Sequence, residues 1–253
     1  MTNPYENFDP SKYPLDTTGF WETWPEHEDP LNYPHPVFEK IISELKPNII
    51  LELGSYKGKS AIQFANICKK LNLNTKIYCV DTWLGSAEHA ESKDLMKVNG
   101  WPTMFYQFLA NVMHTGHQDC IIPMPIDTMS NYRSMKESNV KVPLIYIDAG
   151  HFYESVYSDI KYYWEVLEDG GIMFGDDYEW EGVSAAVKDF FGDKVSIIPS
   201  DQSSSCRFGE NWMIQKSKHE VTIVPSNQYS HEHWMIQKSK PEQVKTDNNS
   251  WRW

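Results

Sequence analysis

Acidic residues recur at the ends of the short apolar segments that this sequence predicts as buried β-strands. They are Glu52, Asp81, Asp148, Asp176 and Asp177, at the ends of the runs 48–53, 76–80, 142–147 and 172–174. Because acidic side chains are poor strand formers, their repeated occurrence at these positions is informative. Open parallel sheets bind ligands outside the carboxyl ends of their strands. The sequence therefore predicts a shared site above one edge of a sheet.

The first of these strand ends leads into a turn that contains two glycines, Gly54 and Gly58. Glycine lets the backbone approach a ligand without a clash from Cβ. The spacing Glu52-x-Gly54-x-x-x-Gly58 differs from Gly-x-Gly-x-x-Gly, so a dinucleotide such as NAD is poorly supported. Asp81 can accept hydrogen bonds from both hydroxyls of a ribose. The glycine turn and Asp81 together favour a nucleoside cofactor without a pyrophosphate. The alternative is that the glycines only form a tight turn and bind no ligand.

The carboxylates of Asp148, Asp176 and Asp177 would repel one another if no positive charge compensated them. Oxygen ligands of this kind suit Mg²⁺, Ca²⁺ or Mn²⁺. We predict that the three aspartates hold one divalent cation, with Mg²⁺ as the expected ion. The alternative is that Asp177 caps the next helix or pairs with a lysine.

One histidine lies beside this acidic group in the sequence. His151 follows Asp148 by three residues, near the start of a predicted helix, where it could take a proton from a substrate hydroxyl. The alternative role is capping or structural hydrogen bonding. His114 and His117 have the spacing of a metal pair, but no third ligand is evident, so we predict a surface loop there.

Strand and helix segments alternate along the chain, which predicts an α/β fold that would position these residues. The expected architecture is a doubly wound, Rossmann-like, mostly parallel sheet. The first predicted helix begins at Pro36 and ends before Pro47. Four further helices are predicted at 60–71, 103–114, 153–167 and 183–191. The predicted strands are 48–53, 76–80, 120–124, 142–147, 172–174, 195–198 and 212–214.

Composition narrows the class of protein. The 253 residues carry a formal net charge of −12, which argues against a nucleic-acid partner because phosphate binding needs clustered Lys and Arg. No apolar run approaches the ~20 residues of a membrane span, and the N-terminus lacks the pattern of a signal peptide. The cysteines form no C-x-x-C pair, so we expect reduced thiols in a cytoplasmic protein: Cys68, Cys79, Cys120 and Cys206. The sequence leaves open whether the protein forms a homo-oligomer.

The chain divides into one domain with two extensions. Residues 1–35 are rich in proline and aromatic residues and predict an irregular arm that packs on the domain at 36–218. Residues 219–253 predict a tail, disordered after Lys240. The heptapeptide Trp-Met-Ile-Gln-Lys-Ser-Lys occurs at 212–218 and again at 234–240. We expect the first copy to form the last core strand and the second to be a local duplication.

Four segments together resemble a known family. They are Ile50-Leu-Glu-Leu-Gly54, Val80-Asp-Thr-Trp-Leu-Gly85, Tyr146-Ile-Asp-Ala-Gly-His151 and Gly171-Ile-Met-Phe-Gly-Asp-Asp-Tyr178. This set is similar to class I S-adenosylmethionine methyltransferases, more narrowly to the bacterial branch related to macrolide sugar O-methyltransferases and cephalosporin hydroxylase-type proteins. The resemblance covers roughly residues 36–200.

The resemblance implies a cofactor site, a metal site and a reaction. Glu52 and Gly54 would contact the methionine part of S-adenosylmethionine, Asp81 the ribose, and Asp127 and Thr128 would lie near the adenine. The full implied cofactor set is Glu52, Gly54, Ser55, Gly58, Ser60, Asp81, Thr82, Trp83, Asp127, Thr128 and Asp148. The family also carries a metal at positions matching the three aspartates.

We predict metal-dependent O-methylation of a hydroxyl on a small molecule, a sugar or another polyhydroxylated metabolite, with a phenol or catechol as a further option. His151 and Asp148 are the predicted catalytic residues. The alternatives are a hydroxylase-type relative of the same fold, or a partner subunit that binds the cofactor without catalysis.

Overall fold

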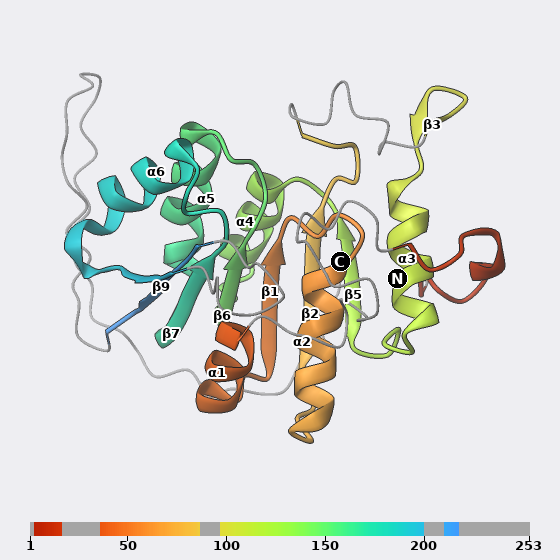
Figure 1. Ribbon diagram of the computed structural model, residues 1–253, viewed down its shortest axis with the longest axis horizontal. Coiled ribbons are helices and arrows are strands. Elements are labelled where there is room, and N and C mark those ends of the chain that lie inside the picture. The colour runs from red at the N-terminus through yellow and green to blue at the C-terminus, as the bar shows by residue number, and fades with distance from the viewer. Residues whose placement is uncertain (1–2, 17–35, 87–96, 200–209, 218–253) are drawn as a thin grey trace.

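A single mixed sheet forms the centre of the computed structural model, which describes residues 3–16, 36–86, 97–199 and 210–217. Its seven strands lie in the order β5-β2-β1-β6-β7-β9-β8 (Figure 1). The strands are β1 (Ile49–Leu53), β2 (Lys76–Asp81), β5 (Ile121–Pro125), β6 (Val142–Ile147), β7 (Leu167–Gly175), β8 (Ser196–Ile198) and β9 (Asn211–Gln215). A separate two-stranded hairpin pairs β3 (Lys97–Val98) with β4 (Trp101–Pro102).

The sheet is parallel from β5 to β7, and β9 pairs antiparallel with both β7 and β8. From β1 the chain proceeds to β2 and β5 on one side, and then returns to β6 on the other side of β1. This reversal makes the gap between β1 and β6 a topological switch point, where open α/β sheets bind ligands. The predicted doubly wound, mostly parallel fold is confirmed.

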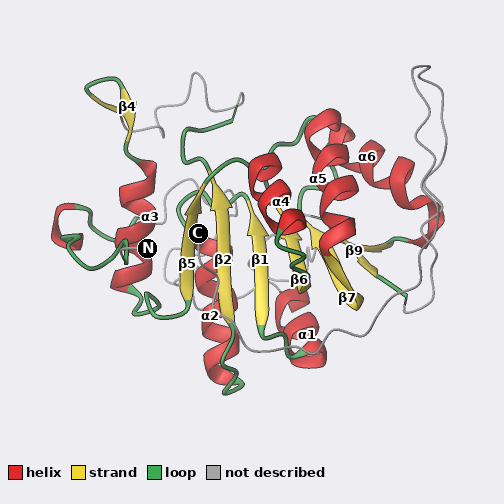
Figure 2. Ribbon diagram, turned by 180° about the vertical axis from the view of Figure 1, so that it is seen from behind, coloured by secondary structure: helices red, strands yellow, loops and turns green. Residues whose placement is uncertain are grey.

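Helices cover both faces of the sheet, as parallel strands require. Helices α1 and α2 lie on one face, and α4, α5 and α6 lie on the other (Figures 1 and 2). Each face of the sheet has its own hydrophobic core, and strand β1 contributes to both. Ile50 packs in the core under α1 and α2, whereas Leu51 and Leu53 pack in the core under α4, α5 and α6. The helices are α1 (Pro36–Leu45), α2 (Lys59–Lys70), α3 (Met104–His114), α4 (Thr128–Glu137), α5 (Tyr153–Val166) and α6 (Glu181–Phe191).

Several elements differ from the prediction, among them the β3–β4 hairpin, where the sequence predicts no strand. Helix α4 was not expected, because only Met129, Tyr132 and Met135 offer apolar side chains there, and they form a narrow stripe with a spacing of three. Strand β7 was predicted at 172–174 and begins five residues earlier, at Leu167. The reason is tertiary: the buried ammonium of Lys216 donates to the carbonyls of Trp164 and Leu167, which ends α5 and fixes the start of the strand.

The described part of the arm, residues 3–16, packs on the domain beside α3 and β5. Tyr5 is buried and its hydroxyl donates to the carbonyl of Ile121 at 3.1 Å. A short 3₁₀ helix, η1 (Pro10–Lys12), follows. None of the helices in the described ranges has the length and apolar character needed to cross a bilayer.

The first copy of the repeated heptapeptide contributes to β9, with Trp212 fully buried, as predicted. The second copy and the tail 219–253 lie outside the described residues, as does Cys206. Within the described ranges Cys68, Cys79 and Cys120 are free thiols.

Candidate active site

The glycine turn after β1 lies directly against the end of β6. Gly54 has φ +83°, and a Cβ atom there would overlap the carbonyl oxygen of Asp148 and come within 2.6 Å of Ala149 Cα. Only glycine fits this position, because both the backbone angle and the space forbid a side chain. Gly58, with φ +88°, precedes α2 and packs against Phe108. The turn therefore brings the strand ends of β1 and β6 into contact.

Glu52 braces this turn from below. Its side chain is fully buried, and its two carboxyl oxygens accept hydrogen bonds from the hydroxyls of Ser55 and Ser60, each at 2.5 Å. Burial raises the pKa of Glu52 to about 7, although the two hydroxyls oppose the shift. The carboxylate acts on the turn through Ser55 and Ser60, and its contact with the methionine part of a cofactor stays a prediction.

Asp81, at the end of β2, holds the same turn from the side. One carboxyl oxygen accepts the backbone N–H groups of Ser55 and Tyr56, both at 2.9 Å, and the other accepts that of Trp83 at 2.7 Å. Thr82 is exposed, and its hydroxyl accepts the N–H of Leu84 at 3.2 Å. The glycine turn is thus ordered by hydrogen bonds from two neighbouring strand ends.

Trp83, which the resemblance assigns to the cofactor site, is buried beside the glycine turn, and its cofactor role stays a prediction. Its side chain is only 2% exposed and lies between the rings of Phe105 and Phe108. The indole N–H donates to the carbonyl of Tyr56 at 2.8 Å. Its polar atom and both flanks are therefore engaged by the protein, and Trp83 supports the turn from inside the core.

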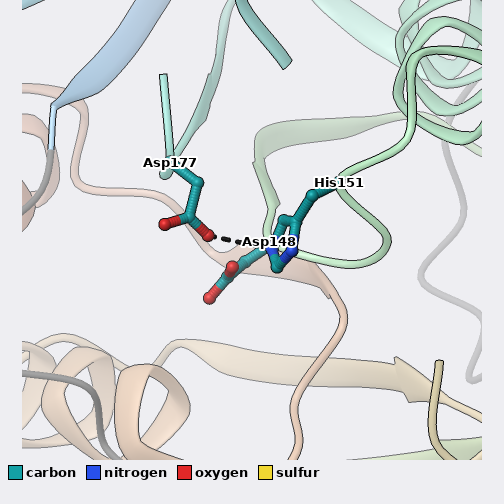
Figure 3. A group of neighbouring side chains, drawn as sticks. All are labelled: Asp148, His151 and Asp177. Carbon is teal, nitrogen blue, oxygen red and sulfur yellow. Dashed lines mark ion pairs between the residues drawn. The ribbon is translucent and has the colours of Figure 1, made fainter. Parts of the chain in front are cut away.

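On the other side of the switch point, Asp148, His151 and Asp177 point toward one another (Figure 3). One ligand atom from each lies within 4.8 Å of the others. His151 Nε2 is 2.9 Å from Asp177 Oδ2. The three side chains come from the ends of β6 and β7, so the sheet topology alone places them together. A site of two carboxylates and an imidazole is suited to a divalent cation.

Asp176 does not belong to this group of three, although the sequence predicted it as a ligand. Its Oδ1 accepts the side-chain amide of Asn211 at 3.0 Å and the backbone N–H of Asp177 at 2.9 Å. Strand β7 ends at Gly175, and Asp177 has φ 58°, so the backbone turns between the two aspartates and directs their side chains to different partners. The compact set therefore contains His151 in place of Asp176.

The carboxylates remain electrostatically close. Burial, followed by the charges of Asp177 and Asp176, raises the pKa of Asp148 well above its usual value. Burial and the charge of Asp177 also raise the pKa of Asp176 to about 7. Tyr146, fully buried behind them, places its hydroxyl 3.3 Å from Asp148 Oδ2. This end of the sheet carries negative charge that the described side chains compensate poorly.

Asp127 and Thr128 follow β5, the strand next to β2, and so reach the same edge as Asp81. The N–H of Ile126 donates to the carbonyl of Asp81 at 3.1 Å. Asp127 is exposed and caps α4 by accepting the N–H of Ser130 at 2.9 Å. Hydrogen bonds from the side chain and then the backbone of Ser130 lower the pKa of Asp127. The structure thus places Asp127 and Thr128 close to Asp81 at the carboxyl edge of the sheet.

The histidine pair near α3 corrects one expectation. His114 is exposed at the end of α3, but His117 is buried and its Nε2 lies 2.8 Å from Asn66 Oδ1. The prediction of a surface loop is wrong for His117, because an isolated polar residue gives no periodicity that would reveal its burial.

Two features of the site escaped sequence reasoning. The ring of Trp180 lies 5.0 Å from that of His151, and half of Trp180 remains exposed. Lys57, inside the glycine turn, is buried and paired with Asp16 of the arm at 2.8 Å. A lysine between Gly54 and Gly58 is unusual, and this was the signal available for the Lys57–Asp16 pair. No local sequence signal indicated the contact between Trp180 and His151.

Comparison with known proteins gives a family and a fold. A family model described as a methyltransferase domain matches residues 51–178, just over half of the chain. An O-methyltransferase from Bacillus cereus, solved in complex with SAH, aligns with 76% of this chain and 84% of its own at 14% identity and TM-score 0.50. The O-methyltransferase NovP aligns over 72% and 78% at 13% identity and TM-score 0.53.

A further solved structure, described as a putative O-methyltransferase from Klebsiella pneumoniae, aligns over 77% and 84% at 14% identity and TM-score 0.51. At these identities the solved structures show a shared fold. No curated protein matches the sequence significantly.

Proposed function

The chain belongs to the methyltransferase domain family, and from this premise we propose that it transfers the methyl group of S-adenosylmethionine to a hydroxyl oxygen of a small molecule. One observation carries the proposal. The glycine turn that would hold the methyl donor touches the strand end that carries Asp148, next to His151 and Asp177. A donor on the turn and an acceptor at the cluster would therefore be neighbours, as in-line transfer requires.

The cofactor side of the proposal uses the turn and its neighbours. Asp81 would accept the ribose hydroxyls, and Gly54, Ser55, Gly58 and Ser60 would shape the pocket for the methionine part. Asp127 and Thr128 would lie near the adenine, because they sit beside Asp81 at the same edge. The Bacillus cereus O-methyltransferase of the same fold is bound to SAH, which supports this choice of cofactor.

The acceptor side fits a divalent cation. Asp148 and Asp177 would hold it, with Asp176 as the third carboxylate, which leaves His151 as the proton acceptor; Mg²⁺ or Mn²⁺ are the ions that match such oxygen donors. The raised pKa of Asp148 supports this assignment, since a cation would relieve the repulsion among these carboxylates. Once bound, the cation would lower the pKa of an acceptor hydroxyl.

His151 would take the proton from that hydroxyl. Asp177, 2.9 Å from Nε2, would orient the imidazole, and the ring of Trp180 would limit its rotation. The same ion pair supports a second, metal-free form of the reaction, in which the His151–Asp177 pair acts as the base without a cation. The acceptor we propose is a sugar or another polyhydroxylated metabolite.

The test is formation of S-adenosylhomocysteine with a panel of sugars, phenols and catechols, before and after treatment with EDTA. We expect turnover with a hydroxyl acceptor, its loss in EDTA, and its recovery on adding Mg²⁺ or Mn²⁺. Full activity of the metal-free protein would leave only the His151–Asp177 form of the proposal. Binding of S-adenosylhomocysteine without methylation of any acceptor would favour a partner subunit that does not catalyse.

A further inference from the structure

The arm and the glycine turn are joined by a buried ion pair. Lys57 lies between Gly54 and Gly58, and its side chain is only 4% exposed. Its ammonium is 2.8 Å from Asp16 Oδ2, at the end of the described arm. The pair connects positions 41 residues apart, so it forms only when the arm is docked on the domain.

Asn111 of α3 completes the junction. Its side-chain oxygen accepts the backbone N–H of Asp16 at 3.0 Å, and its side-chain nitrogen donates to the carbonyls of Asp16 and Lys57, both at 2.9 Å. Gln107, one turn earlier, donates to Asn111 Oδ1 at 2.9 Å and to the carbonyl of Pro14 at 2.8 Å. Asn111 thereby uses both of its donors and both acceptor positions.

This arrangement couples the arm to the shape of the turn. A buried ammonium needs a paired carboxylate, because an unpaired charge is costly away from water. Without Asp16, the Lys57 ammonium keeps its contact with the Tyr56 ring but loses its carboxylate, and the Lys57 carbonyl loses the alignment that Asn111 supports. Ser55 and Gly58 lie on the same turn, within two residues of Lys57, so such a rearrangement would change the surface offered to a cofactor.

We propose that residues 3–16 are a positioning element for the cofactor, acting on the glycine turn through the Asp16–Lys57 pair. The inference rests on the proposed function, since it assigns the turn to S-adenosylmethionine. It treats Asp16, Lys57 and Asn111 as positioning residues that need not touch the cofactor. Docking of the arm and binding of the cofactor then favour each other, and by linkage each must strengthen the other equally.

The first test measures affinity. Asp16→Asn in the full chain should weaken binding of S-adenosylhomocysteine by calorimetry about tenfold, within the range usual for coupled sites. KM for S-adenosylmethionine should rise similarly while kcat at saturation stays close to wild type. The matched control is Glu39→Gln, which removes the exposed Glu39–Lys70 pair on α1 and α2 and should leave affinity unchanged.

A double-mutant cycle makes the measurement specific to the pair. Lys57→Gln combined with Asp16→Asn removes both charges, so the combined loss of affinity should be smaller than the product of the two single losses. Independent, multiplicative losses would contradict a coupling through this pair. The comparison uses folded variants well below their melting temperatures, so a general loss of stability does not enter it.

The second test reads the coupling in reverse. Hydrogen exchange of the peptide containing the Asp16 amide, which donates to Asn111, should slow when S-adenosylhomocysteine is added to the wild type. Unchanged exchange, or an affinity of Asp16→Asn within about twofold of wild type, would show that the arm merely packs on the domain. If the wild type binds no S-adenosylhomocysteine, the cofactor assignment fails and the inference fails with it.

Discussion

The two halves of the candidate site satisfy their carboxylates in different ways. On the β1–β2 side, Glu52 and Asp81 receive hydrogen bonds from hydroxyls and backbone N–H groups of the turn that they support. On the β6–β7 side, Asp148 and Asp177 lie together with His151, and Asp176 accepts from Asn211 beside them. Burial raises the pKa of Glu52, Asp148 and Asp176, but neighbouring carboxylates add strongly to the shift only on the β6–β7 side. The carboxylates of the β1–β2 half have hydrogen-bond partners on both oxygens, whereas those of the β6–β7 half lie close to one another and carry excess negative charge.

The difference indicates a division of labour. Hydrogen bonds made in advance fix the shape of the turn, which suits recognition of a cofactor that arrives unchanged in each cycle. Carboxylates that lie close enough to raise one another's pKa suit a cation and a proton acceptor, whose charges change during a reaction. If this comparison holds, mutations in the β1–β2 half should weaken cofactor binding, and mutations in the β6–β7 half should lower the catalytic rate.

The largest expected effect lies in the β6–β7 half. His151→Ala should lower kcat by about 10²–10⁴, the range for loss of a general base, with nearly unchanged affinity for S-adenosylhomocysteine. Initial rates as a function of pH should lose the acidic limb that a histidine base is expected to give the wild type, and added imidazole should restore part of the rate. An equal loss of cofactor affinity would break the comparison, because His151 would then belong to both halves.

A pH-dependent change of stability is expected from Glu52. Its pKa is about 7 in the folded protein, above the ordinary 4.5, so the folded state binds the proton more tightly and stability falls as pH rises between these values. Glu52→Gln removes this penalty. The variant should be more stable than wild type by about 3 kcal/mol at pH 8, with no gain below pH 4.5.

Urea unfolding of the cofactor-free protein at pH 4.5, 6 and 8 measures the Glu52 effect. The difference between the two curves should grow across this series and level off above pH 7. A constant difference at all three values would mean that Glu52 stays ionised, held by Ser55 and Ser60.

A smaller effect is expected from Asp81. Asp81→Ala should weaken binding of S-adenosylhomocysteine by about 1.5–3 kcal/mol, the range for hydrogen bonds to a charged group, while kcat at saturation changes little. Because Asp81 also holds the turn, an analogue lacking one ribose hydroxyl separates its two roles. The analogue should lose affinity for the wild type and much less for Asp81→Ala. Equal losses in both proteins would confine Asp81 to support of the turn.

Local pattern was enough to predict most of the fold. Apolar runs with acidic ends identified β1, β2, β6 and the end of β7, and amphipathic spacing identified the helices apart from α4. The missed helix has few apolar residues, and its one clear signal was Asp127 as a cap. The start of β7 could not be predicted locally, because Lys216, 49 and 52 residues away, donates to the carbonyls of Leu167 and Trp164.

The sequence by itself determined which residues stand at the carboxyl edge of the sheet, since a strand that ends in an acid delivers that acid to the edge wherever the strand pairs. Only the tertiary structure decided which of them meet. The contact between Gly54 and Asp148, the enclosure of Glu52 and Trp83, the choice of His151 over Asp176 beside Asp177, and the docking of Asp16 on Lys57 all depend on segments far apart in the chain. Such contacts follow from strand order and packing, for which the local sequence carries no signal.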